Sequence, residues 1–112
     1  MTRCRWLALS LLLAVPFALG SAPPSGERQQ QLRHMLLHDC GSCHGMTLAG
    51  GLGPPLLPVA LDGKPLEYLS AIILDGRPGS AMPGWRGMLS EADARWLAER
   101  LQSGELAVAD GS

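Results

Sequence analysis

Few aromatic side chains and no excess of positive charge characterise this sequence of 112 residues. It contains three Trp, one Tyr and one Phe, and its nine Lys and Arg stand against ten Asp and Glu. A nucleic-acid-binding domain normally carries a basic patch, so this balance of charge argues against that class. Neither internal repeats nor the alternating pattern of half-buried strands is present, which argues against repeat architectures and an all-β fold.

Long hydrophobic runs are absent except at the N-terminus. Arg3 and Arg5 precede an apolar run over residues 6–19. In Ala18-Leu19-Gly20 at its end, small residues occupy both positions that a signal peptidase requires. The run is short for a membrane span. We therefore expect residues 1–20 to be an export signal that is cleaved after Gly20, with an uncleaved anchor as the alternative.

The part of the chain that follows this signal is slightly acidic. Removal of Arg3 and Arg5 leaves seven basic residues against ten acidic ones, a net charge of −3. The remaining 92 residues suffice for one domain with a thin core, which would gain from a large apolar ligand. We expect this domain at residues 27–102, between a flexible tail at 21–26 and a C-terminal tail at 103–112.

Stretches of helix-forming residues alternate with stretches rich in Gly and Pro. Ser25, Pro65 and the run Ser90-Glu91-Ala92-Asp93 have the residue types that begin helices, and Gly76 is typical of a helix end. Long loops are uncommon in a compact domain unless they wrap a ligand or carry function. We predict helices at Glu27–Asp39, from Lys64-Pro65 to Gly76 and from Ser90 to about Gln102, joined by irregular loops at Gly45–Val59 and Arg77–Gly87.

Cysteine is scarce, and its spacing is informative. Cys4 lies in the predicted signal, so only Cys40 and Cys43 remain in the exported chain. A disulfide between these two residues would close too small a loop to add much stability. The pair is therefore expected to serve chemistry rather than structure.

Cys40-Gly41-Ser42-Cys43-His44 is a C-x-x-C-H sequence, the attachment motif of c-type haem. Two thiols about one helical turn apart can each bond to one vinyl group of a haem, and His44 is then directed at the iron. A zinc knuckle is an alternative, but it needs two further ligands, for which only His34 and His38 remain. A thioredoxin-like redox pair is another, although the βαβ pattern that accompanies it is missing.

These features together resemble the class I monohaem cytochromes c over residues 27–101. The resemblance implies an all-α fold in which three to four short helices and two Gly/Pro loops wrap around one covalent haem c. Gly53-Pro54-Pro55-Leu56 is similar to the family's G-P-x-L loop. In this family the first Pro carbonyl accepts a hydrogen bond from the ligand His, which implies that Pro54 orients His44.

The sixth iron ligand is expected on the opposite side of the haem. Met46 follows His44 too closely, and Met35 is interpreted as a packing residue. Met82 precedes Pro83 in the loop before the last helix, as in the family's ligand loop. Met82 is therefore the predicted ligand; Met88 and an open or His-ligated iron are the alternatives.

The runs Asp39–Gly45, Gly50–Pro54, Gly76–Gly79 and Met82–Trp85 are similar, more specifically, to the small periplasmic monohaem cytochrome c encoded beside the cytochrome cd type nitrite reductase in denitrification operons. This implies a monomeric, periplasmic electron carrier without catalytic residues and without a membrane span after signal cleavage. Its redox partner would be that reductase, or its role would be in maturation of the d-type haem. The alternatives are a general periplasmic electron shuttle and a small haem peroxidase or sensor with an open iron site.

Several further residues allow more than one interpretation. His34 and His38 are spaced i, i+4, so they form either a metal-binding pair or an ordinary helix surface. Trp85 either packs on the haem or bonds to a propionate, and Trp96 with Leu97 resembles the pair that packs the last helix on the first. Arg77 and Arg86 either pair with propionates, mark a docking rim, or are solvated.

Overall fold

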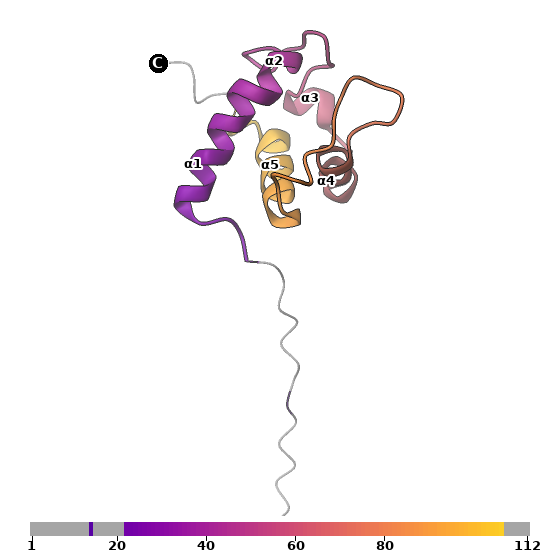
Figure 1. Ribbon diagram of the computed structural model, residues 1–112. Helices are drawn as coiled ribbons and strands as arrows, with labels where there is room; N and C mark the ends of the chain where they lie inside the picture. The colour runs from indigo at the N-terminus through magenta and orange to yellow at the C-terminus, as the bar shows by residue number, and fades with distance from the viewer. Residues whose placement is uncertain (1–13, 15–21, 107–112) are drawn as a thin grey trace, which may run out of the picture.

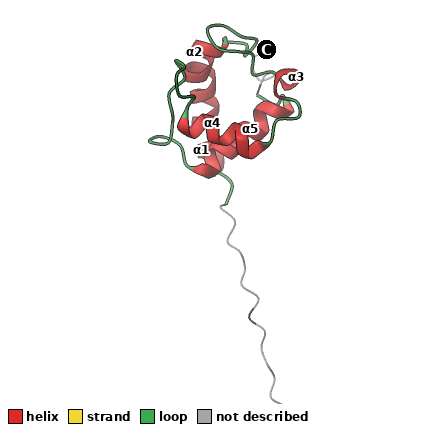
Figure 2. Cartoon of the chain, turned by 90° about the vertical axis from the view of Figure 1, so that its right-hand side faces the viewer, coloured by secondary structure: helices red, strands yellow, loops and turns green. Residues whose placement is uncertain are grey.

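The computed structural model describes residue 14 and residues 22–106, and within these residues every regular element is a helix (Figures 1 and 2). The predicted signal therefore lies outside the described residues, apart from residue 14. None of the helices in the described part is long and apolar enough to cross a membrane. The elements are α1 (Gly26–Met35), the π-helix η1 (Leu36–Cys40), α2 (Gly41–His44), α3 (Pro58–Leu61), α4 (Leu66–Asp75) and α5 (Glu91–Ser103).

The first helical rod runs without interruption from Gly26 to His44. The Ser25 side chain accepts a hydrogen bond from the Arg28 N–H at 3.2 Å, which confirms the predicted N-cap. The rod changes pitch near its end, because the Gly41 N–H donates to the carbonyl of Leu36, five residues earlier. The sequence did not predict this wider turn, which lies directly before the cysteine motif.

The last helix begins as its sequence predicts. Ser90 and Asp93 form both hydrogen bonds of a capping box, each at 3.1 Å. Gly76 ends α4 with a φ of 70°, a conformation that favours glycine. Figure 1 shows α4 and α5 side by side, with the loop that joins them rising above α4.

Three predicted boundaries need correction. The first helix does not end at Asp39, because η1 and α2 continue it to His44. Pro58 and Val59 begin the short helix α3 and do not belong to the irregular loop predicted at Gly45–Val59. Proline suits this position because the first helical N–H has no intrahelical acceptor. At the C-terminus, α5 extends to Ser103, and the side chain of Leu106 is only 3% exposed. Residues 103–106 thus contribute to the packed domain rather than to a free tail.

The hydrophobic core gathers buried side chains from the helical rod, both loops, α3, α4 and α5. Leu32, Leu36, Leu48 and Leu97 are fully buried, and Trp96 is nearly so. Leu48 belongs to the first loop and has a φ of +60°, a strained conformation that costs on the order of 1 kcal/mol. Burial of its side chain gains about 1.5–3 kcal/mol, so Leu48 fixes the loop to the core despite the strain.

Candidate functional site

The cysteine motif straddles the junction between the wide turn and α2. Cys40 is the last residue of η1, and Cys43 and His44 belong to α2. Cys40 is partly buried and Cys43 is exposed, and both are free thiols. Burial, followed by the neighbouring Asp39 and Cys43, raises the pKa of the Cys40 thiol to about 11. Cys40 is therefore protonated at neutral pH, which is unlike the thiolate of a reactive redox pair.

The zinc alternative gains no support from the geometry. No group of three or more His, Cys, Asp or Glu side chains in the described residues is arranged to hold a metal ion. A structural zinc site requires four such ligands. The pair His34 and His38 lies together on the outer side of the rod and does not join the cysteines.

The imidazole of His44 is held by the loop that follows it. Its Nδ1 lies 2.7 Å from the carbonyl oxygen of Pro54. A carbonyl oxygen only accepts hydrogen bonds, so Nδ1 must carry the proton. Nε2 then keeps its lone pair, which is the tautomer that binds a metal ion.

The same loop folds back on the end of α2 through its backbone. The Gly50 N–H donates to the His44 carbonyl, and the Gly53 N–H donates to the Cys43 carbonyl, both at 2.8 Å. A Cβ atom on Gly53 would lie 2.7 Å from Cε1 and 2.8 Å from Nδ1 of His44, and one on Gly51 would lie 2.8 Å from the Cys43 carbonyl oxygen. Only glycine at these two positions lets the loop lie against the imidazole ring.

The second loop holds Met82 near the end of α4. The Met82 carbonyl accepts a hydrogen bond from the Arg77 N–H at 3.3 Å, and its oxygen would be 2.6 Å from a Cβ atom on Gly76. Gly84 makes a similar close approach to the Leu74 carbonyl. These contacts fix the backbone on both sides of the Met82 side chain, which is partly buried. Met88, the alternative ligand, is 59% exposed.

Trp85 and Arg86, two further candidates for contact with a haem, already have contacts within the protein. Trp85 packs against the buried core, and Arg86 is engaged with Asp75 at 2.8 Å and with Glu91 at 3.8 Å. Arg77 is exposed. The ion pairs of Arg86 leave it poorly available for a ligand carboxylate.

Trp96 is a packing residue of the α1–α5 contact. It is 3% exposed, and the guanidinium groups of Arg33 and Arg100 lie 5.3 and 5.1 Å from its ring centre. Leu97 beside it is fully buried. This agrees with the structural interpretation of the pair.

The donor atoms suit a haem covalently held by the chain. Two thiols about one helical turn apart, an imidazole with a free Nε2 and a thioether on a separate loop are the ligand types of a c-type haem. Carboxylates, which hard metal ions prefer, are not among them.

Known proteins of similar sequence or fold include c-type cytochromes. The family model described as cytochrome C oxidase, cbb3-type, subunit III matches residues 27–99. Cytochrome c55X from Pseudomonas aeruginosa is 58% identical over 103 residues, which cover 91% of this chain and 87% of that protein. The solved structure of the c-type cytochrome NirC is 60% identical with a TM-score of 0.73, covering 74% of this chain and 98% of NirC.

A larger protein is similar over part of its length. The solved structure of dihydro-heme d1 dehydrogenase NirN in complex with DHE is 36% identical to this chain, with a TM-score of 0.57. The match covers 62% of this chain and only 15% of the dehydrogenase. The fold described above therefore also occurs as a small part of a much larger enzyme.

Proposed function

This chain belongs to the c-type cytochromes, as a nir-associated electron carrier rather than an enzyme, and we propose that it carries single electrons on one haem c bound through Cys40 and Cys43. His44 and Met82 are the proposed axial ligands. A haem bound in this way supplies a one-electron couple, which no side chain of this chain offers by itself.

The observation that carries the proposal is the 2.7 Å contact between His44 Nδ1 and the Pro54 carbonyl. It supports His44 as a ligand because an Nδ1 that donates to the carbonyl leaves Nε2 unprotonated, with its lone pair free to bind a metal ion. It also increases the basicity of the imidazole and limits its rotation. Both effects favour a permanent ligand over one that exchanges with solvent.

Met82, in the second loop, completes the proposed ligand set. Its backbone is fixed at Gly76 and Gly84, so the thioether is presented without a large loss of conformational entropy. A thioether opposite an imidazole favours reduced iron and raises the reduction potential relative to two imidazoles. If His44 and Met82 both held the iron, peroxidase or sensor chemistry, which needs an open iron position, would not be favoured.

Two redox partners fit a carrier of the nir system, and the export signal proposed at residues 1–20 would place this chain in the periplasm. One is the cytochrome cd type nitrite reductase, to which the protein would donate electrons. The other is an enzyme of d-type haem maturation. The similarity to dihydro-heme d1 dehydrogenase NirN makes this second role specific, because a dehydrogenase releases two electrons, which a one-haem carrier accepts in two encounters.

The haem proposal is tested on the purified mature protein. Acid–acetone extraction should leave one haem per chain on the polypeptide, as measured by the pyridine haemochrome spectrum. The double variant Cys40→Ser/Cys43→Ser should carry no covalent haem. Complete extraction of haem from the native protein would overturn the assignment.

The partner proposal is tested by stopped-flow absorbance. The reduced protein is mixed with oxidised nitrite reductase, and the oxidised protein is mixed with the dehydrogenase and its dihydro substrate. Fast, saturable electron transfer in one pair identifies that role. Slow transfer in both pairs would leave the general periplasmic shuttle, the alternative that the sequence also allows.

A further inference from the structure

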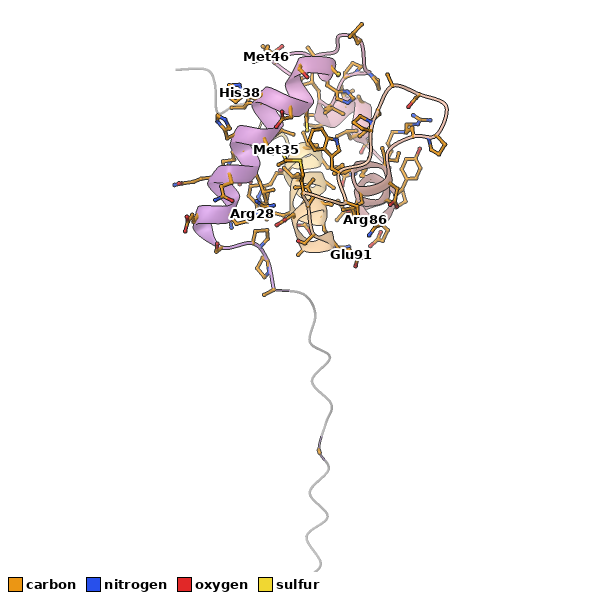
Figure 3. All side chains as sticks on the ribbon, viewed as in Figure 1. Arg28, Met35, His38, Met46, Arg86 and Glu91 are labelled. Atoms are coloured by element: carbon orange, nitrogen blue, oxygen red, sulfur yellow. The ribbon has the colours of Figure 1, made fainter. Side chains whose placement is uncertain are left out.

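A pair of histidines on the outer side of the helical rod has no part in the proposed haem site. His34 lies in α1 and His38 in η1, and both side chains are exposed. Their ring centres are 4.2 Å apart, and the ring planes are tilted by 44°. Figure 3 shows His38 on the side of the rod that faces away from α5. The two rings are thus neighbours on an open surface.

The wide turn brings these rings into register. Four residues exceed one turn of an α-helix by about 40°, so i and i+4 side chains are normally offset. The step from His34 to His38 crosses from α1 into η1, where more residues make up each turn. This reduces the offset and brings the second ring over the first.

From this geometry we infer that His34 and His38 form an exchangeable binding site for a late first-row divalent cation, with Cu²⁺ bound most strongly. Two imidazoles that hold one ion at about 2.0–2.1 Å per nitrogen bring their ring centres to within about 5 Å of each other. The observed 4.2 Å requires only a small rotation of the rings to reach this arrangement. Imidazole suits Cu²⁺, Ni²⁺ and Zn²⁺, and Cu²⁺ stands highest in affinity among them.

The surroundings leave the pair available. Within residues 22–106, the imidazole of His44 has a hydrogen-bond partner, whereas those of His34 and His38 have none. The nearest cation in the sequence, Arg33, has its guanidinium over the Trp96 ring, so it is drawn toward α5. Asp39 is exposed and follows His38 directly. Since no third His, Cys, Asp or Glu of the described residues completes a cluster, water fills the remaining positions of the ion and binding stays reversible.

The test is a calorimetric titration of the mature holoprotein, without a polyhistidine tag, with Cu²⁺. One Cu²⁺ per chain should bind, and the copper EPR spectrum should show nitrogen coupling. His34→Gln and His38→Gln should each weaken binding at least tenfold, because the second imidazole acts at high effective concentration. Zn²⁺ should bind at the same site more weakly than Cu²⁺.

Two further variants test whether the affinity depends on the spacing of the two histidines or only on the number of histidines. His38→Gln/Gln30→His places an exposed imidazole four residues before His34 and should restore much of the affinity. His38→Gln/Val59→His keeps three histidines but places the third on the exposed face of α3, so affinity should stay low. Native affinity in either single variant, or restoration by Val59→His, would overturn the inference. The haem spectrum of each variant verifies that the fold is intact.

Discussion

The guanidinium of Arg28 donates two hydrogen bonds, of 2.8 and 3.2 Å, to one carboxylate oxygen of Asp93, 65 residues away in the sequence. The same guanidinium also donates to the carbonyl of Met88 at 2.9 Å. Because Asp93 completes the capping box with Ser90, this pair joins the first turn of α1 to the first turn of α5. It fixes the angle at which the helical rod crosses the last helix.

The Asp93 carboxylate makes stability dependent on pH. Burial opposes ionisation of Asp93, but hydrogen bonds from Arg28 and from the Ser90 backbone outweigh it and hold its pKa below the ordinary value of 3.8. A lowered pKa contributes stability above the pKa of the unfolded chain, and this stability is lost as the pH falls through the folded pKa. Arg28→Ala should lower the free energy of unfolding at pH 7 by about 1.5–3 kcal/mol, the range for hydrogen bonds to a charged group.

Urea unfolding between pH 2.5 and pH 7 measures this effect. The variant should lose less stability on acidification than the native protein. Arg86→Ala is the control, since its ion pair with Asp75 is exposed and should contribute little. Parallel pH profiles for Arg28→Ala and the native protein would show that the pair does not set the acid response.

Gly53→Ala should disturb His44 directly. The new methyl group would lie 2.7 Å from the imidazole Cε1, so either the ring or the loop must move. We expect haem to stay attached through the cysteines, with a weakened Met82 band and a lower reduction potential. Gly87→Ala is the matched control because its Cβ has open space and its φ is not positive. Visible spectroscopy and voltammetry compare the two variants; identical spectra would place the ring elsewhere in the holoprotein.

Met82→Ala should completely remove the charge-transfer band expected for iron bound to methionine, and it should lower the reduction potential. Met88→Ala should leave both unchanged, since Met88 is exposed. Loss of the band in Met88→Ala instead would move the ligand assignment to that residue. The spectra are measured on the oxidised proteins, and the potentials by voltammetry.

Docking of a redox partner should depend on the first loop. The segment from Cys40 to Leu61 contains no Asp, Glu, Lys or Arg, and Leu52 within it is 96% exposed. Small, weak interfaces suit redox encounters, and an apolar surface of this kind gains from excluding water. Leu52→Glu and Leu52→Lys should both slow bimolecular electron transfer severalfold, because each buries a charge in the encounter complex.

Matched substitutions at Met88 are the control for docking. Met88 is also exposed, but its backbone contacts Arg28 at the far end of the rod. Stopped-flow rates measured at several salt concentrations compare the two sites. Equal effects at Leu52 and Met88, or none at either, would indicate that the partner binds another face.

Local hydrogen bonds explain why much of the fold was predictable. Ser25, Ser90 with Asp93, and Gly76 act on backbone groups within four residues of themselves, so their sequence context alone determined the helix ends that the structure confirms. The spacing of Cys40, Cys43 and His44 likewise fixed the chemistry expected of the motif, because covalent attachment depends on one short segment.

Other features required the tertiary structure. The sequence did not predict the wide turn at Leu36–Cys40, the short helix at Pro58 or the burial of Leu106. Leu36, Leu61 and Leu106 from these segments join one buried cluster, and this burial depends on residues that are distant in the sequence. The partnership of Arg28 with Asp93 and the approach of Gly84 to Leu74 join segments that the sequence keeps apart. The sequence thus predicted which residues would carry the chemistry and determined where helices begin, since these depend on near neighbours. How the helical rod, α3 and α4 pack around α5 was decided only in the tertiary structure, because burial of the leucine core selects one arrangement among many with the same local structure.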